Sequence, residues 1–194
     1  MSFAPDNSTL VRTRWLQRLL QPLAAWLMRC SGWQLLGPIP TLKRYVLIAA
    51  PHTSNWDFVL MVLAVLKAGI DLHWMGKHSL FRAPFGGLMR WLGGIAIDRR
   101  KSNNVVAQMI DIFAQRDELI LLITPEGTRS QVQRWKTGFY SIADGAGVPI
   151  VPVYVDGEQR TLTFGAPFVP SGDLDTDLAK IQARYAGLRG VRAR

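Results

Sequence analysis

The sequence predicts a single α/β domain in which helices flank a mostly apolar central sheet, and two patterns carry this prediction. Short apolar runs alternate along the chain with longer amphipathic segments, which is the order typical of α/β proteins. Most of these runs are continuously apolar, as strands covered on both faces require. The chain has 194 residues, of which 48% are hydrophobic and 19% charged, and this balance suits one packed domain rather than a disordered polymer.

The apolar runs and amphipathic segments place the expected elements along the chain. The six predicted strands cover residues 45–50, 72–75, 94–98, 119–124, 150–155 and 161–164. The four best predicted helices cover residues 58–68, 104–115, 137–144 and 174–188. The last helix begins with Asp175 and Asp177, and acidic residues in a first turn interact favourably with the helix dipole.

Residues 1–41 differ from the rest and are predicted to be an amphipathic, membrane-associating segment, which leaves residues 42–194 as the main domain. Within the segment, the apolar face of a helical wheel holds Trp15, Leu16, Leu19, Leu20, Leu23, Trp26 and Leu27, and the basic face holds Arg14, Arg18 and Arg29. Pro22 is expected to kink this stretch or divide it into two short helices. Two interpretations stay open: the apolar face lies in a membrane interface, or it packs on the core.

The net charge of +9 predicts an anionic partner, either nucleic acid or anionic lipid. Seven tryptophans, most of them beside apolar residues, favour the boundary between lipid and water. A nucleic-acid role is disfavoured because the cations follow strand ends instead of forming a stripe interleaved with stacking aromatic residues. An anionic membrane surface is therefore the expected partner.

The cysteine content and the early apolar stretch bear on the compartment. The single cysteine, Cys30, excludes an intramolecular disulfide, and no Cys and His cluster has zinc-ligand spacing, so a reducing compartment is expected. The stretch 19–28 is interrupted by Gln21 and Pro22 and is too short to span a bilayer. Because the first ten residues lack the basic region of a secretory signal, we expect cytoplasmic residence.

The strongest signal for chemistry is the segment 51–57, Pro-His-Thr-Ser-Asn-Trp-Asp, which directly follows an apolar strand. In a continued strand His52 and Asp57 would lie about 16 Å apart, so a turn is needed to bring them together. Asp57 would then orient Nδ1–H of His52, and Nε2 would act as general base on a bound hydroxyl. Ser54 lacks the strained G-x-S-x-G turn of a nucleophilic serine. The alternative is that Asp57 caps the helix and His52 is an ordinary loop histidine.

Two further strand ends carry residues suited to anions. The segment 124–130, Thr-Pro-Glu-Gly-Thr-Arg-Ser, offers close backbone approach at Gly127 and the planar fork of Arg129. Residues 99–101 are three consecutive cations after the predicted strand 94–98. Either cluster alone would indicate a solvated basic turn, but three such strand ends together favour a site.

Four other polar residues lie within and after the predicted strand 72–75. His73 and His78 lack a carboxylate at metal-ligand spacing and are interpreted as structural. Lys77 and Arg82 are interpreted as a solvated basic edge, with binding of donor phosphates as the alternative.

Four ordered motifs resemble those of the glycerolipid acyltransferases typified by 1-acylglycerol-3-phosphate acyltransferase. They are H-x-x-x-x-D at His52 and Asp57, a block ending in arginine at residues 94–99, E-G-T-R at 126–129 and V-P-I-V-P-V at 148–153. The resemblance covers a little over half of the chain. Pro51 and Thr124 stand where well-known members often carry asparagine and phenylalanine, and this departure leaves the acceptor open.

The resemblance implies an O-acyltransferase that uses His52 as general base and Asp57 as its orienting partner, with no metal and no bound cofactor. The substrate-binding residues that it implies are Arg99, Glu126, Gly127, Thr128 and Arg129. The donor would be acyl-CoA or acyl carrier protein, the acceptor a lysophospholipid, and the location the cytoplasmic face of the inner membrane, peripheral or monotopic. Two alternatives remain: a noncatalytic lipid-surface binding module, and a thioesterase-like hydrolase in which water replaces the acceptor.

Overall fold

A seven-stranded sheet forms the centre of the computed structural model, which describes residues 9–11, 13–54, 56–97, 105–127 and 134–191. The strands are β1 (Gln34–Leu36), β2 (Arg44–Ala50), β3 (Leu72–Lys77), β4 (Gly94–Ile97), β5 (Leu119–Ile123), β6 (Ile150–Asp156) and β7 (Thr161–Phe164). Their spatial order is β1-β7-β6-β2-β5-β3-β4. Strands β6, β2, β5, β3 and β4 are parallel, whereas β7 runs antiparallel to β6.

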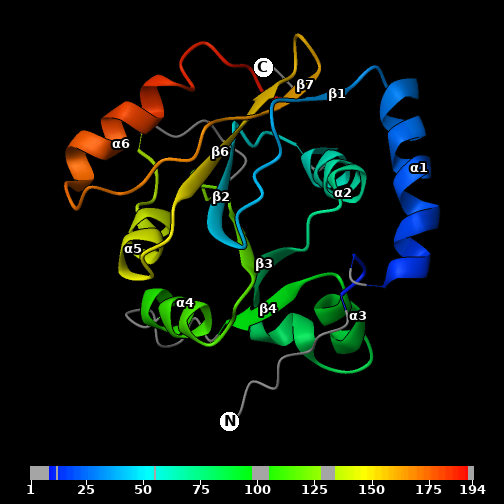
Figure 1. The fold of residues 1–194 in the computed structure, drawn as a ribbon, viewed down its shortest axis with the longest axis horizontal. Helices are drawn as coiled ribbons and strands as arrows, with labels where there is room; N and C mark the ends of the chain where they lie inside the picture. The colour runs from blue at the N-terminus through cyan, green and yellow to red at the C-terminus, as the bar shows by residue number, and fades with distance from the viewer. Residues whose placement is uncertain (1–8, 12, 55, 98–104, 128–133, 192–194) are drawn as a thin grey trace.

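Helices cover both faces of the sheet and form layers on either side of it (Figure 1). They are α1 (Arg14–Cys30), α2 (Trp56–Ala68), α3 (Gly86–Trp91), α4 (Val105–Ala114), α5 (Gly138–Gly145) and α6 (Leu174–Ala183), with one short 3-10 helix, η1 (His78–Phe81). In Figure 1, α4, α5 and α6 lie on one side of the strands, and α2 lies on the other with α1 outside it. The predicted single α/β domain is confirmed.

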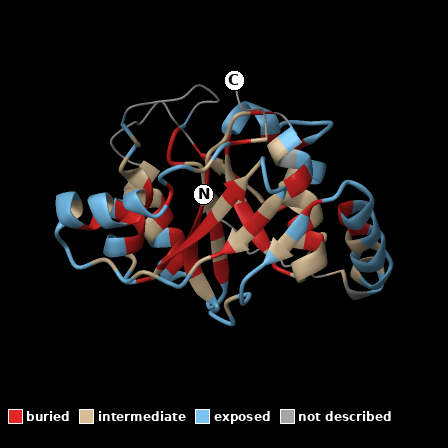
Figure 2. Cartoon of the chain, turned by 90° about the horizontal axis from the view of Figure 1, so that it is seen from above, coloured by how far each residue is buried: buried red, intermediate tan, exposed pale blue. Residues whose placement is uncertain are grey.

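The core lies mainly on the two faces of the sheet, as the buried strands between partly exposed helices show in Figure 2. Side chains alternate along β2, so Val46 and Ile48 pack toward α4 and α5, whereas Tyr45 and Leu47 pack on the side of α2. All six predicted strands are present, with ends that differ from the prediction by at most two residues within the described ranges. Asp98, the predicted end of one strand, lies outside the described residues.

Three short elements were not predicted from the sequence. β1 has only three residues and pairs with β7, so the first 41 residues contribute a strand to the sheet. Neither η1 nor α3 reaches two full turns, too short for a helical period to show in the sequence.

Two predicted helix boundaries are wrong. The helix from residue 174 ends at Ala183 rather than at residue 188, and Gly187, with φ of 83°, has a left-handed conformation that interrupts a helical path. The N-terminal helix runs without a break from Arg14 to Cys30, so Pro22 does not divide it. Pro22 lies on the exposed side of the helix, where water can hydrate the carbonyl that lacks its helical donor.

The apolar residues of helix α1 lie partly in the protein core and partly on its exposed surface. Ala24, which is 1% exposed, and Met28 are buried against α2 and the neighbouring strands. In contrast, Trp15 is 67% exposed and four further large side chains of the same helix, Leu19, Leu23, Trp26 and Leu27, are exposed as well. Among the described residues, no helix combines the length and apolarity needed to cross a membrane.

Candidate active site

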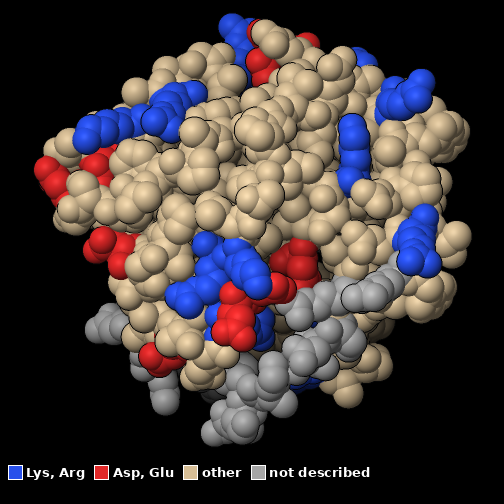
Figure 3. All heavy atoms as spheres, viewed as in Figure 1, with Lys and Arg blue, Asp and Glu red and all other residues tan. Residues whose placement is uncertain are grey.

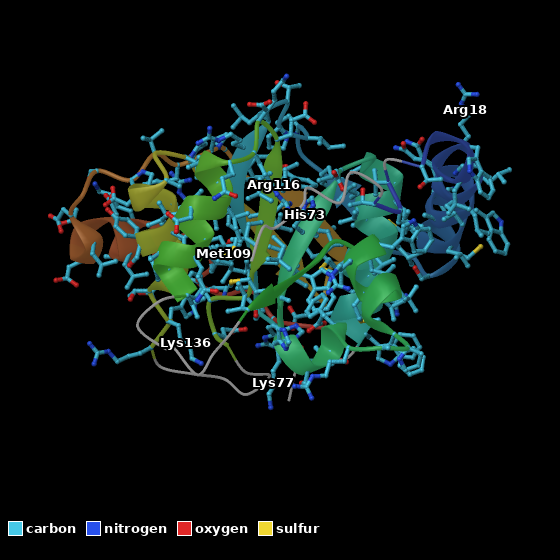
Figure 4. All side chains as sticks on the ribbon, turned by 90° about the horizontal axis from the view of Figure 1, so that it is seen from below. Arg18, His73, Lys77, Met109, Arg116 and Lys136 are labelled. Carbon is cyan, nitrogen blue, oxygen red and sulfur yellow. The ribbon has the colours of Figure 1, made fainter. Side chains whose placement is uncertain are left out.

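The carboxyl ends of the parallel strands meet at one edge of the sheet, and the predicted site residues follow these ends. His52 comes two residues after β2, and Glu126 three residues after β5. Figure 4 shows the labelled Lys77, at the end of β3, and Lys136 at this carboxyl edge, with Arg116, which precedes β5, toward the opposite edge. The crevice outside the carboxyl ends of an open α/β sheet is the usual ligand site.

The loop after β2 turns back so that its two ends meet, as the sequence required. His52 Nδ1 lies 2.9 Å from Asp57 Oδ2. The same oxygen accepts hydrogen bonds from the backbone N–H groups of Thr53, at 2.7 Å, and Ser54, at 2.8 Å. Asp57 lies in the first turn of α2, so a rigid element fixes the carboxylate.

This arrangement fixes the chemistry of the imidazole. Because the Asp57 carboxylate only accepts, the neutral ring of His52 donates its proton from Nδ1, and Nε2 is the acceptor nitrogen. His52 is 23% exposed, which leaves the ring open to a ligand. The Ser54 hydroxyl accepts a hydrogen bond from Trp56 N–H at 3.1 Å, a loop-stabilising role rather than that of a nucleophile.

Glu126 braces the same loop from the neighbouring strand end. Its Oε2 accepts a hydrogen bond of 2.6 Å from the backbone N–H of His52, so β5 and β2 are linked beyond the sheet. Burial raises the pKa of the Glu126 carboxyl above its ordinary value of 4.5, while the hydrogen bond from His52 and the nearby imidazole act in the opposite direction. No feature of the sequence signalled this contact, because the donor is a backbone amide.

Gly127 forms a tight turn under a lysine. Its φ is 62°, and its N–H donates to Thr124 O at 3.1 Å. A Cβ here would lie 2.8 Å from the side chain of Lys136, which therefore covers the glycine. Lys136, which was not predicted from the sequence as a site residue, donates its backbone N–H to Pro125 O at 2.8 Å. The structure thus places one more cation at the carboxyl edge.

Three of the predicted substrate-binding residues, Arg99, Thr128 and Arg129, lie outside the described residues, and so do Arg100 and Lys101.

An apolar pocket of about 220 Å³ opens beside the His52–Asp57 pair, between α2 and the sheet. His52, Asp57 and Thr124 are its polar lining, and every other lining residue is apolar. The apolar lining consists of Leu35, Leu47, Ala49, Pro51, Leu60, Met61, Ala64, Val65, Ile70, Leu72, Trp74, Leu122, Val153, Val155, Leu162 and Phe164. A lining of this kind suits an apolar ligand such as an alkyl chain.

One face of the molecule carries charges of both signs. On the face seen in Figure 3, basic residues near the centre lie among acidic ones, and other basic residues are scattered. Elsewhere among the described residues, Lys43 and Glu118 form an ion pair at 3.5 Å. Among the described residues of this face, the figure shows no continuous basic stripe of the kind that follows a phosphate backbone.

Comparisons with known proteins agree with the geometry. Residues 33–156 match the model of the protein family described as Acyltransferase. The 1-acyl-sn-glycerol-3-phosphate acyltransferases of Salmonella typhimurium and Escherichia coli are each 36% identical over 122 residues, which cover 59% of this chain and 48% of theirs. The alpha form of that enzyme in Mus musculus is 27% identical over 126 residues, covering 62% of this chain and 43% of its own. The chain thus spans about half the length of the curated relatives it matches.

A solved structure has the same fold. The crystal structure of the 1-acyl-sn-glycerophosphate (LPA) acyltransferase PlsC from Thermotoga maritima superposes with a TM-score of 0.65 at 17% identity. The match covers 94% of this chain and 81% of that one.

Proposed function

Because this chain belongs to the acyltransferase family, we propose that it transfers a fatty acyl group from acyl-CoA or acyl carrier protein to a hydroxyl of a lysophospholipid such as 1-acylglycerol-3-phosphate. The relatives from Salmonella typhimurium and Escherichia coli, named for that acceptor, support the substrate class. The observation that carries the proposal is the hydrogen-bonded His52–Asp57 pair at the mouth of an apolar pocket.

The proposed reaction proceeds by direct attack of the acceptor. Nε2 of His52 removes the proton from the acceptor hydroxyl while its oxygen attacks the thioester carbonyl carbon. Asp57 stabilises the imidazolium that forms. The tetrahedral intermediate then collapses, the carbon–sulfur bond breaks, and the imidazolium returns the proton to the thiolate. The products are the ester and a free thiol, and neither step requires a metal or a bound cofactor.

The contacts of the loop amides limit where the oxyanion can bind. The N–H groups of Thr53 and Ser54 donate to Asp57, and that of His52 donates to Glu126. These three amides already have acceptors, so the oxyanion of the intermediate takes its donors from other groups at the carboxyl edge.

The polar head of the acceptor is assigned to the carboxyl edge. We propose that Arg99 and Arg129 bind its phosphate, because their planar guanidinium groups suit bidentate binding. We propose that Gly127 and Thr128 also contact the polar head of the acceptor. Glu126 serves this region by holding the backbone of His52.

Helix α1 is proposed as the contact with an anionic membrane, which makes the protein a peripheral enzyme of the cytoplasmic face. The exposed stripe of Trp15, Leu19, Leu23 and Trp26 supports this role, because it remains unburied while the opposite side of the helix packs on α2. Both substrates carry long alkyl chains, so docking avoids extracting them fully into water.

One assay tests the reaction against both alternatives. Purified protein is incubated in detergent with acyl-labelled acyl-CoA or acyl carrier protein, with and without lysophospholipid. A transferase forms labelled diacyl product only when the acceptor is present. Free labelled fatty acid independent of the acceptor would show a hydrolase, and recovery of intact donor under all conditions would show a noncatalytic binding module.

A further inference from the structure

The segment from η1 to α3 presents a second exposed apolar surface next to the carboxyl edge. Leu80, Phe85 and Leu88 are all exposed, and Phe85 is 65% exposed. We define these three side chains as the hairpin surface. Single exposed apolar residues are common, but three on one segment of nine residues need an explanation.

The hairpin surface rests on a fixed base. Phe81, the last residue of η1, is buried and packs on Trp74 with ring centroids 6.0 Å apart. The guanidinium of Arg90 lies 5.7 Å from the centre of the same Phe81 ring. A Cβ on Gly86 would lie 2.1 Å from Phe81 O, so only glycine permits this close approach of α3 to η1. The exposed side chains are therefore held outward by a packed support.

The segment that carries the hairpin surface is basic. Residues 72–97 contain no aspartate or glutamate, whereas Lys77, Arg82 and Arg90 are all exposed. Neither Lys77 nor Arg82 pairs with a carboxylate among the described residues. A segment that exposes both apolar side chains and cations suits a bilayer containing anionic lipid, which has an apolar interior and an anionic surface.

The segment that carries the hairpin surface lies near the start of α1. The segment before α1 is joined to the end of α3 by a hydrogen bond of 2.8 Å from Leu10 N–H to Trp91 O. Figure 1 shows α3 near the start of α1, on the same side of the sheet. A carrier protein docked on the hairpin surface would leave the exposed apolar side chains of α1 in water. A bilayer could cover both the hairpin surface and these side chains of α1.

We infer that the hairpin surface of Leu80, Phe85 and Leu88 is a second membrane-inserting contact, which together with α1 orients the carboxyl edge toward an anionic bilayer. The inference rests on the proposed docking of α1. A protein bound through one helix can rotate about that helix on the membrane, whereas two contacts fix its orientation. The mouth of the pocket is then held facing the lipid surface.

The first test measures insertion directly. In a Cys30→Ser background, which removes the single cysteine, an environment-sensitive fluorophore is attached at Phe85→Cys or, as matched control, at Val169→Cys. Val169 is 74% exposed and lies outside the hairpin. On addition of phosphatidylglycerol–phosphatidylcholine vesicles the emission of the label at 85 shifts to the blue, and that of the label at 169 does not. Unchanged emission at 85 while the protein sediments with the vesicles would overturn the hairpin contact and leave the docking of α1 standing.

The second test measures what the surface contributes. Phe85→Ser with Leu88→Ser is expected to lower the vesicle partition coefficient about tenfold, equivalent to about 1.4 kcal/mol, whereas Val169→Ser leaves it unchanged. Turnover of detergent-dispersed substrates stays at the wild-type level, because neither side chain lines the pocket. Loss of that turnover would overturn the inference by showing that the surface supports the site.

The remaining outcomes separate this inference from the proposals it rests on. If the double variant binds vesicles normally but has a raised KM for acyl carrier protein, the surface takes that protein and the membrane contact is wrong. If wild-type protein does not bind the vesicles at all, both the α1 contact and the hairpin contact fall. Failure of wild-type protein to make acceptor-dependent product in detergent would overturn the proposed reaction alone, since neither the fluorescence nor the sedimentation depends on turnover.

Discussion

At the scale of single residues, His52 and Asp57 carry the central prediction. His52→Ala and Asp57→Asn are each expected to lower kcat in the detergent assay by about 10²–10⁴-fold, the usual contribution of a positioned general base. Asp57→Asn keeps the shape of the side chain but no longer enforces the Nδ1–H tautomer. Circular dichroism spectra and melting temperatures close to wild type serve as the control for folding. Near-normal turnover by either variant would exclude the proposed mechanism.

Glu126 gives a prediction about stability and pH. Its raised pKa means that the folded protein holds this proton more tightly than the unfolded chain does. The protonated Glu126 carboxyl therefore stabilises the folded protein at low pH. This contribution to the free energy of unfolding is lost as pH rises from the ordinary value of 4.5 through the raised pKa. In Glu126→Gln, whose amide oxygen still accepts from His52 N–H, that loss is absent.

Urea denaturation of wild type and Glu126→Gln over a pH series measures this difference. We expect the variant to gain stability relative to wild type as pH rises through this interval, and Gln182→Glu on the surface of α6 provides a control for adding one carboxylate. A difference between wild type and Glu126→Gln that is constant with pH would contradict the raised pKa.

The residue scale also shows which parts of the site a sequence can predict. The spacing of His52 and Asp57 after an apolar strand showed that only a turn could bring them into contact, but it left open that Asp57 caps the helix and His52 is an ordinary loop histidine. The bond between Glu126 and the backbone of His52 was not predictable, since every residue has a backbone amide. The family resemblance implied an apolar channel, but its lining residues could not be identified, because they have the same apolar character as ordinary core residues.

At the scale of elements, α1 serves the fold with one side and, by our proposal, the membrane with the other. Leu19→Ser with Leu23→Ser is expected to leave the melting temperature near wild type and to lower vesicle partitioning about tenfold or more, because both side chains are exposed. Ala24→Asp is the opposite case. It puts a charge at a position 1% exposed and should destabilise the protein by on the order of 3 kcal/mol.

Liposome sedimentation and thermal melts of these variants decide between the two interpretations of α1 better than deletion of the helix, which would remove both sides together. If Leu19→Ser with Leu23→Ser binds vesicles as well as wild type, the exposed stripe has another purpose.

The elements also show why most strands could be predicted and some helices could not. β2, β5 and β6 are covered on both faces and read as unbroken apolar runs. β1, η1 and α3 are too short to show a period, and their positions depend on partners such as β7 and Phe81. Pro22 misled the prediction for α1, because its cost depends on whether the freed carbonyl can reach water.

At the scale of the whole molecule, the pocket between α2 and the sheet leads to a prediction about chain length. Ala64 and Met61 line it from α2, and Met61 also lines a smaller adjoining cavity of about 50 Å³. Ala64→Phe is expected to shift the preferred acyl donor toward shorter chains by filling the pocket, whereas Met61→Ala shifts it toward longer chains by joining the cavities. Competition among acyl-CoA species of graded length measures both shifts, each variant serving as the control for the other. The same length profile in both variants would show that the chain binds elsewhere.

The strand order has a consequence for how the protein acquires its site during synthesis. β2 is made early, but its neighbours in the sheet are β5 and β6, which leave the ribosome much later. Until then the apolar strand has no partner, and closing the long intervening loop carries an entropic cost before any contact compensates for it. The loop of His52 can close locally on Asp57, but its second support arrives only with Glu126. In a nascent chain the loop of His52 therefore lacks part of its support, and β2 depends on protection from aggregation, until β5, Glu126 and β6 have been synthesised.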